Sequence, residues 1–363
     1  MPTVRVKLGV GGYEILISSA LLDELGHHTR AAIGESANQA VLISNETVDS
    51  MYGSRAAKSL ARADFKIHRF RFGDGERFKN LRTAEALYAF LIEHRIERSD
   101  IIVALGGGVV GDLAGFVAAT YVRGIRFIQV PTTLLAQIDS SVGGKTGVNH
   151  QLGKNLIGAF HQPSLVVIDP DLLRTLSSRE MGAGLFEAIK YGVIKDRRVF
   201  DQIVGKIDKL RSLQSAEINH LIARCCAIKA AVVERDERES GLRKILNFGH
   251  TVGHALEAVT HYRRFLHGEA VGYGMLAASR IAERMGLLSA GDRARIEEGV
   301  AGIGPLPRAN TLAPDDIISA MHRDKKVEGG RTAFVLPLEI GKVVIRSDVP
   351  LQAVRAALKE TLR

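Results

Sequence analysis

The fold is decided by residues 100–116, DIIVALGGGVVGDLAGF. Five apolar residues (101–105) lead into the spacing G-x-G-x-x-G, formed by Gly106, Gly108 and Gly111, and a helical pattern follows. Glycines at such a turn let backbone N–H groups approach a pyrophosphate, and the helix N-terminus favours its charge. The stretch therefore predicts a buried strand, a tight turn and a helix that bind a dinucleotide. The alternative is that these glycines serve only close packing of strand against helix.

The segments on either side of this stretch alternate between strand and helix patterns. Short β-branched or apolar runs occupy residues 4–8, 13–18, 40–44, 66–72, 126–133 and 165–169. Amphipathic stretches lie between several of them, such as LRTAEALYAFLIEHR at 81–95. This alternation predicts an α/β fold with a largely parallel, doubly wound, Rossmann-like sheet.

The pattern changes after residue 170. Helical periodicity dominates from about residue 180 to 324, one hairpin is predicted at 332–349, and a last helix is predicted from residue 351. We therefore expect two domains. Residues 1–175 would form an NAD-binding α/β domain, and residues 176–363 a mainly α-helical domain that binds metal and substrate.

Composition restricts the partners. The chain has 49 Lys and Arg against 40 Asp and Glu, a net charge of +9, which favours anionic ligands. Aromatic residues make up only 6%, Trp is absent, and the basic residues are scattered among acids, which argues against nucleic acid as a partner. Small phosphorylated ligands fit this balance better.

Other features indicate a cytoplasmic protein. No run of about 18 apolar residues is present, so we expect no membrane partner. The N-terminal segment alternates like a strand and lacks the apolar core of a signal peptide. Cys225 and Cys226 are adjacent, and a bridge between neighbours would be strained, so reduced thiols are the simpler interpretation.

A carboxylate for a nucleotide ribose is missing from its usual place. No acid ends the strand that follows the glycine turn. Asp74 and Glu76, directly after the run at 66–72, are well placed instead. A plain surface turn is the alternative for Asp74-Gly75-Glu76.

A long glycine-rich segment, residues 130–160, is the second candidate. Its GGKT at 143–146 resembles a Walker loop, but the preceding G-x-x-x-x-G spacing is absent, so we reject that reading. Long loops inside compact domains are more often functional than idle, and a solvated connection is the alternative. The side chains suited to phosphate and nucleotide contacts are Thr132, Thr133, Asp139, Lys145, Lys154 and Asn155.

Two helical segments carry candidate metal ligands. In 182–196, Glu187 and Lys190 share a helix face, although an exposed Glu–Lys pair would look the same. In 242–275, His250 and His254 stand four residues apart, and His267 follows. Two histidines at this spacing are often a satisfied pair, but a third histidine and a carboxylate favour a catalytic divalent ion.

Taken together, these motifs resemble the 3-dehydroquinate synthase family from about residue 72 to 326. The resemblance rests on DGERFK, GGGVVGDLAGF, QVPTTLLAQIDSSVGGKTGVN, GKNLIGAFHQP, FEAIKYG, LNFGHTVGHALE, LHGEAVGYGM and HRDKK, in this order. It implies conversion of 3-deoxy-D-arabino-heptulosonate 7-phosphate to 3-dehydroquinate and phosphate, with NAD+ and one divalent ion, Zn2+ or Co2+. It also implies a homodimer.

The resemblance further implies roles for individual residues. The metal ligands would be Glu187, His250 and His267, which makes His254 a substrate or proton-relay residue and overrules the helical-pair interpretation. The NAD contacts would be Asp74, Glu76, Lys79, Gly108, Val109, Val110, Gly111, Asp112, Thr132, Thr133, Lys145, Lys154 and Thr175. The substrate and catalytic set would be Arg123, Asp139, Lys145, Asn155, Lys190, Lys229, Glu239, Arg243, Asn247, His254 and Lys325.

Three other functions remain open. A metal-dependent polyol dehydrogenase would release NADH and would not need the cluster of phosphate-binding Lys and Arg. Another sugar-phosphate cyclase would share the NAD and metal residues but differ in the substrate pocket; the presence of Arg243, Asn247 and His254 together favours the dehydroquinate reaction. A non-catalytic NAD-binding protein would be expected to have lost one of the three metal ligands.

Overall fold

The computed structural model describes residues 2–9, 11–323, 327–328 and 331–363. Contacts divide the chain into two compact units. The sheet unit comprises Met1–Leu176 and Ile218–Arg238, and the helical unit comprises Ser177–Glu217 and Glu239–Arg363.

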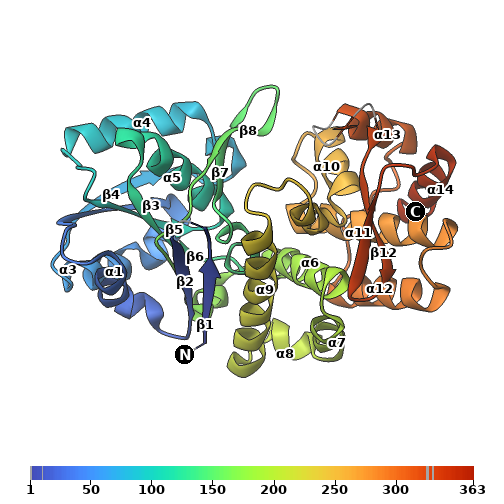
Figure 1. The fold of residues 1–363 in the computed structure, drawn as a ribbon, viewed down its shortest axis with the longest axis horizontal. Coiled ribbons are helices and arrows are strands. Elements are labelled where there is room, and N and C mark those ends of the chain that lie inside the picture. The colour runs from blue at the N-terminus through green and yellow to red at the C-terminus, as the bar shows by residue number, and fades with distance from the viewer. Residues whose placement is uncertain (1, 10, 324–326, 329–330) are drawn as a thin grey trace. The chain divides into compact units, whose positions relative to one another are not determined.

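The sheet unit contains a seven-stranded sheet in the order β1-β2-β9-β6-β5-β3-β4 (Figure 1). Every neighbouring pair in it is parallel except β1 with β2. The predicted doubly wound sheet is thereby confirmed. Its strands are β1 (Thr3–Lys7), β2 (Gly12–Ile17), β3 (Gln39–Asn45), β4 (Lys66–Phe72), β5 (Ile101–Gly106), β6 (Arg126–Pro131) and β9 (Leu165–Ile168).

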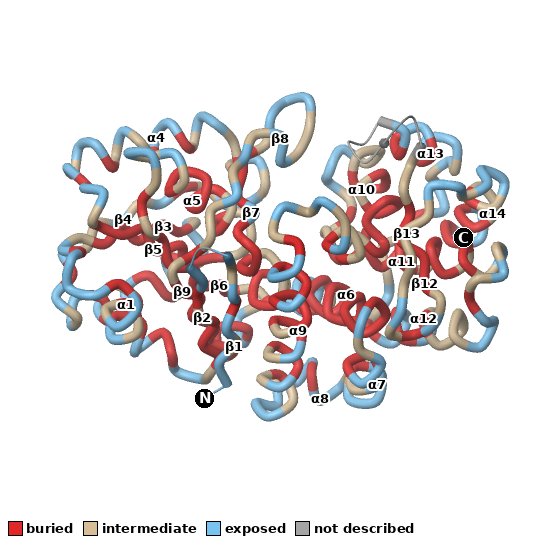
Figure 2. Tube along the Cα trace, viewed as in Figure 1, coloured by how far each residue is buried: buried red, intermediate tan, exposed pale blue. Residues whose placement is uncertain are grey.

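Helices cover both faces of this sheet. On one face, Leu25 and Leu60, from α1 (Leu25–Ile33) and α3 (Ser54–Ala61), belong to the same core as Val103 of β5. On the other face, Leu87 and Leu113, from α4 (Leu81–Glu93) and α5 (Gly108–Thr120), join the core that contains the alternate β5 residues. Because β5 is buried on both faces (Figure 2), its sequence is continuously apolar rather than alternating.

The segment 130–160 is more regular than the predicted glycine-rich loop. It forms a π-helical turn (Ala136–Ser140) and an antiparallel hairpin, β7 (Lys145–His150) and β8 (Gly153–Phe160). Gly147 and Gly158 face each other across this hairpin, and a Cβ at Gly158 would lie 2.3 Å from the Thr146 carbonyl oxygen. The glycines thus allow close strand approach, which explains why the segment lacks an ordinary strand pattern.

A helix from the second half of the sequence joins the sheet unit. Most of α9 (Ser215–Arg235) belongs there, as Ile218–Arg238. Cys226 on α9 donates a hydrogen bond of 3.3 Å to the backbone carbonyl of Gln137, and Glu234 accepts one of 2.7 Å from the backbone N–H of Lys7. No sequence pattern indicates that α9 belongs to the sheet unit, and the assignment of functions to residues 1–175 and 176–363 stays a prediction.

The helical unit is built mainly from α6 (Ser178–Ile194), α10 (His250–Val259) and α11 (His267–Arg284). Its other helices are α7 (Arg197–Gly205), α8 (Ile207–Arg211), α12 (Ala290–Ile303), α13 (Pro314–Arg323) and α14 (Leu351–Thr361). The predicted late hairpin is present as β12 (Phe334–Glu339) and β13 (Lys342–Arg346), beside a short pair, β10 (Val327–Glu328) and β11 (Arg331–Thr332). A mainly helical second half is confirmed.

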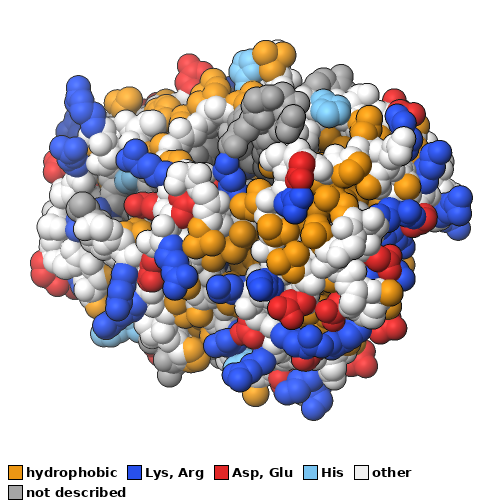
Figure 3. All heavy atoms as spheres, turned by 45° about the vertical axis from the view of Figure 1, so that its right-hand side comes forward, with side chains coloured by type: hydrophobic (Ala, Val, Ile, Leu, Met, Phe, Trp, Pro, Cys, Tyr) orange, Lys and Arg blue, Asp and Glu red, His pale blue; other side chains and the backbone are white. Residues whose placement is uncertain are grey.

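The surface is mixed in charge. On the face drawn in Figure 3, Lys and Arg side chains lie among Asp and Glu side chains rather than in one continuous basic stripe. Among the described residues, no helix has an apolar stretch long enough to cross a membrane.

Candidate functional site

Three helices of the helical unit each contribute one side chain to a common point. Glu187 lies in the middle of α6, His250 is the first residue of α10, and His267 is the first residue of α11. Helix α6 begins at a Ser177 cap, whose hydroxyl accepts a hydrogen bond of 3.2 Å from the Glu180 N–H. Its following turns are buried from Ala183 onward, so the Glu187 carboxylate is removed from water.

Glycines bring these helices unusually close. A Cβ on Gly268 of α11 would lie 1.9 Å from the Ala183 carbonyl oxygen of α6. A Cβ on Gly274 would lie 1.7 Å from the carbonyl oxygen of Gly249, the residue before α10. Larger residues would force the backbones apart. These contacts fix the separation of the helices that carry the three side chains.

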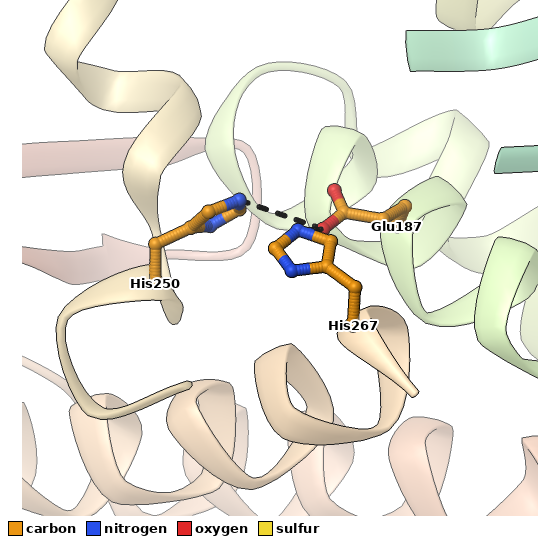
Figure 4. A group of neighbouring side chains, drawn as sticks. All are labelled: Glu187, His250 and His267. Carbon is orange, nitrogen blue, oxygen red and sulfur yellow. Dashed lines mark ion pairs between the residues drawn. The ribbon is translucent and has the colours of Figure 1, made fainter. Parts of the chain in front are cut away.

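The two imidazoles face the same oxygen of Glu187 (Figure 4). Nε2 of His250 is 3.6 Å from Glu187 Oε1, and Nε2 of His267 is 3.5 Å from it. The other oxygen, Oε2, is 2.5 Å from Nζ of Lys190, which is also buried. Donor atoms of Glu187, His250 and His267 lie within 4.8 Å of one another.

This donor set fits a divalent cation. Glu187 is fully buried, yet its Oε1 accepts no hydrogen bond from any described residue. A buried carboxylate oxygen without a partner is costly, and a cation between it and the two imidazoles would satisfy it. One carboxylate and two imidazoles are ligands that Zn2+ and Co2+ accept, with positions left open for substrate.

The charge around His267 also favours a cation. Burial opposes protonation of this imidazole, but the carboxylates of Glu257 and Glu187 outweigh burial and raise its pKa to about 10. In the metal-free protein the ring therefore holds a proton at neutral pH. A bound divalent ion would take the place of that proton.

His254 lies beside the cluster of Glu187, His250 and His267 but does not belong to their group of donor atoms. Its ring centroid is 5.3 Å from that of His250 and 5.9 Å from that of His267. The donor atoms that group with Glu187 come from His250 and His267, not from His254. The helical spacing of His250 and His254 reflects proximity on one helix face.

The segment before α10 carries three more of the predicted residues, Glu239, Arg243 and Asn247. Asn247 donates a hydrogen bond of 2.8 Å to Glu239 Oε1, and Arg243 on the same turn (Leu242–Asn247) is only 1% exposed. A buried guanidinium is a planar donor suited to phosphate or carboxylate oxygens. Lys325 lies outside the described residues.

The glycine turn of the sheet unit has the expected form. Gly106 ends β5, Gly107 caps α5 in an extended conformation, and Gly108 begins the helix. A Cβ on Gly111 would lie 2.5 Å from the Gln129 side chain of β6, so this glycine sets the approach of α5 to the sheet. The turn leaves the N-terminal N–H groups of α5 directed beyond the carboxyl end of β5, where parallel sheets bind ligands.

Two of the predicted carboxylates, Asp74 and Glu76, follow the carboxyl end of β4, whereas Asp112 lies on α5 with Val109 and Val110. Asp74 accepts hydrogen bonds from the side chains of Asn45 and Thr47, which lower its pKa. Glu76 accepts one of 2.8 Å from the Asn149 amide. The buried Lys79 donates to Asp112 over 2.7 Å; burial opposes its charge, but Asp112 and Glu76 raise its pKa.

Among the remaining NAD candidates, Thr132 has the clearest sign of a missing partner. It follows β6, is 4% exposed, and its hydroxyl has no hydrogen-bond partner among the described residues. Thr133 accepts a bond of 3.2 Å from the Ala136 N–H, and the exposed Thr175 shares one of 2.7 Å with Tyr52. Lys154 Nζ lies 3.8 Å from Glu76.

The substrate candidates of the sheet unit come from several segments: the π-helical turn, α9, the β7–β8 hairpin and the end of α5. Lys229 on α9 pairs with the Asp139 carboxylate and donates to its carbonyl oxygen over 2.7 Å. Lys145 and Asn155 are exposed on the β7–β8 hairpin. Arg123 is exposed beyond the C-terminus of α5, whose 13 residues place it roughly 20 Å from the glycine turn.

Sequence reasoning missed Glu257. This buried residue of α10 lies 3.2 Å from His267 Nδ1, on the side of the ring opposite Glu187. The available signal was its position three residues after His254 and seven after His250. A carboxylate at that spacing is common on any amphipathic helix, so the sequence did not single it out.

Known proteins match this chain over nearly its whole length. The family model described as 3-dehydroquinate synthase N-terminal matches residues 69–183, and the 3-dehydroquinate synthase C-terminal model matches residues 184–327. A 3-dehydroquinate synthase of Nostoc punctiforme is 47% identical over 360 residues, covering 98% of both chains.

Two solved structures share the fold. A 2-epi-5-epi-valiolone synthase of Streptomyces hygroscopicus with NAD+ and Zn2+ bound has a TM-score of 0.88 at 29% identity, over 98% of each chain. A 2-deoxy-scyllo-inosose synthase complexed with carbaglucose-6-phosphate, NAD+ and Co2+ has a TM-score of 0.89 at 26% identity, over 99% of each chain. Since both family models match consecutive segments and the relatives align end to end, the chain belongs to the 3-dehydroquinate synthase family.

Proposed function

We propose that this chain converts 3-deoxy-D-arabino-heptulosonate 7-phosphate to 3-dehydroquinate and inorganic phosphate, using NAD+ and one divalent metal ion. The observation that carries the proposal is the convergence of His250 and His267 on an unpartnered oxygen of the buried Glu187, in a chain of this family. When bound, NAD+ would accept and return a hydride, and the metal ion would stabilise negative charge on the substrate hydroxyl that is oxidised.

The chain's own residues would bind the substrate and move its protons. Elimination of phosphate needs a ketone next to the carbon that loses its proton, so the substrate hydroxyl must be oxidised first. Because the hydride is returned later, the substrate is oxidised for only part of the cycle. Lys190 and Arg243 are buried cations of the helical unit, suited to hold anionic groups of the substrate. Lys145 and Asn155, exposed on the hairpin of the sheet unit, are further candidates for binding polar groups of the substrate. His254 is suited to pass a proton, because its ring lies next to the ligands without being one.

The glycine turn would hold the cofactor's pyrophosphate. The helix N-terminus of α5 supplies backbone donors, and the unsatisfied Thr132 hydroxyl supplies one more group for the cofactor. Asp74, Glu76, Lys79 and Asp112 would contact the rest of the nucleotide.

The proposal is tested by following two products at once. Purified protein is incubated with the heptulosonate 7-phosphate, catalytic NAD+ and Zn2+ or Co2+. We expect stoichiometric phosphate release without net NADH accumulation, because the cofactor is restored in each turnover. Steady NADH production would indicate a dehydrogenase, and activity only with another sugar phosphate would indicate a different cyclase.

The metal ligands are tested separately by metal content. Glu187→Gln and His267→Ala should lose the bound ion, because each removes one of three ligands. His254→Ala should keep one equivalent and lose activity. Metal loss in the His254 variant, with retention in the other two, would instead support His250 and His254 as the pair of metal ligands.

We also propose that the chain forms a homodimer in the cytoplasm. The family resemblance supports the dimer, and light scattering of the purified protein would measure its mass. Neither Cys225 nor Cys226 forms a disulfide and both are buried, which supports a reducing compartment. A monomeric mass, or a bridged thiol pair in protein isolated from cells, would contradict these assignments.

A further inference from the structure

We propose that Glu257 is a positioning residue for the metal site, which fixes the tautomer and the ring orientation of His267. Its Oε2 lies 3.2 Å from His267 Nδ1, and its side chain is buried. The inference rests on the proposed metal site and concerns a residue outside the predicted ligand and substrate sets.

The two histidines are held by different partners. Nδ1 of His250 lies 3.1 Å from the backbone carbonyl of Phe248, so the chain just before α10 orients that ring. His267 is the first residue of α11, and its ring is held by a carboxylate from the neighbouring helix. Helix α10 therefore provides one ligand, His250, and orients the second.

The backbone of His267 is fixed independently of its ring. Glu269 accepts a hydrogen bond of 2.8 Å from the Leu266 N–H, and Arg179 binds both oxygens of Glu269 at 2.6 and 2.7 Å. Gly268 packs so closely against α6 that an added Cβ would clash with the Ala183 carbonyl oxygen. With the start of α11 held in this way, rotation of the imidazole is the main freedom left, and Glu257 restricts it.

A neutral imidazole carries its proton on one nitrogen, and the hydrogen bond made there leaves the other nitrogen as the ligand. When Nδ1–H donates to Glu257, the Nε2 lone pair faces Glu187, 3.5 Å away. The negative charge of Glu257 also makes the ring a stronger donor to a cation.

A competing interpretation makes Glu257 a ligand itself. Donor atoms of His254, Glu257 and His267 also lie within 4.8 Å of one another, so they could hold a second ion. That arrangement would use His267 Nδ1 as a ligand and leave no proton there for Glu257. The hydrogen-bond distance between Nδ1 and Glu257 favours the positioning role, and metal stoichiometry separates the two.

The experiment compares Glu257→Gln and Glu257→Ala with wild-type protein by chelator competition for Zn2+. Glu298→Gln, an exposed change on α12, is the matched control. We expect one Zn2+ per chain in all four proteins. Affinity should fall about 10- to 100-fold in the two Glu257 variants, more in Ala than in Gln, because the Gln amide oxygen still accepts a hydrogen bond. Glu298→Gln should bind like wild type.

Nitrogen NMR of the Zn2+-loaded wild-type protein gives a second readout that does not depend on any variant folding. We expect His267 to be protonated at Nδ1 and metal-bound at Nε2. The reverse tautomer, equal affinity in Glu257→Ala and wild type, or a second Zn2+ equivalent lost in both Glu257 variants would overturn the inference. Absence of Zn2+ binding by wild type would instead contradict the proposed function.

Discussion

His267 lies between two carboxylates, Glu187 and Glu257, and this decides how metal binding responds to pH. The pKa of its imidazole is raised to about 10, so the metal-free ring is protonated below that pH and neutral above it. A divalent ion needs the neutral ring and must displace the proton. Competition between proton and metal therefore weakens as pH rises toward 10.

We expect the apparent Zn2+ affinity to rise about tenfold per pH unit between about pH 7 and pH 9. Chelator competition at several pH values measures this slope. Calorimetric titration in two buffers of different ionisation enthalpy should show about one proton released per ion bound. An affinity that does not change with pH would show that the ring is already neutral in the metal-free protein.

At the scale of elements, glycine contacts between helices set the geometry of the site. Gly268→Ala would place a methyl group against the Ala183 carbonyl and push α11 away from α6. The free energy of unfolding should fall by about 1–3 kcal/mol, as for other overpacked positions. Because Glu187 and His267 lie on these two helices, Zn2+ affinity should fall as well. Chemical denaturation and chelator competition measure the two effects.

The matched control is Gly302→Ala on α12, where an added Cβ meets nothing within 4 Å. Alanine costs less conformational entropy than glycine in a helix, so this variant should be more stable by about 0.4–1 kcal/mol with unchanged affinity. If Gly268→Ala behaved like Gly302→Ala, the close approach of α6 and α11 would have no role in the site.

The strands were predictable from sequence because their signals are local. The buried β5 is continuously apolar, and the amphipathic α4 covers one face of the sheet, so each could be identified in isolation. The β7–β8 hairpin was missed because its glycines serve close approach to the opposite strand rather than flexibility. Such a glycine has the same local sequence signal as one in a loop.

At the scale of the whole molecule, the order of segments along the chain does not show which of the two units each segment belongs to. Helix α9 follows three helices of the helical unit, yet Cys226 and Lys229 on it bond to residues 137 and 139 of the sheet unit. The metal candidates were found through family motifs, since spacing alone paired His250 with His254. Glu257 was missed because its proposed role depends on a contact between α10 and α11, and no local sequence pattern encodes such a contact.

Removal of the metal tests whether the helical unit depends on it. The ion would replace a proton on His267 and satisfy the buried Glu187 oxygen, so it binds the folded unit and not the unfolded chain. Ligand linkage then predicts a gain of about 4 kcal/mol at a free concentration near 1,000 times Kd. Dialysis against a chelator should abolish phosphate release and lower the thermal midpoint, and Zn2+ or Co2+ should restore both. The metal-free Glu187→Gln variant provides the control: because it lacks one of the three ligands, it should be insensitive to chelator and to added ion. Full activity after chelation, with no bound metal left, would show that the cluster serves another purpose.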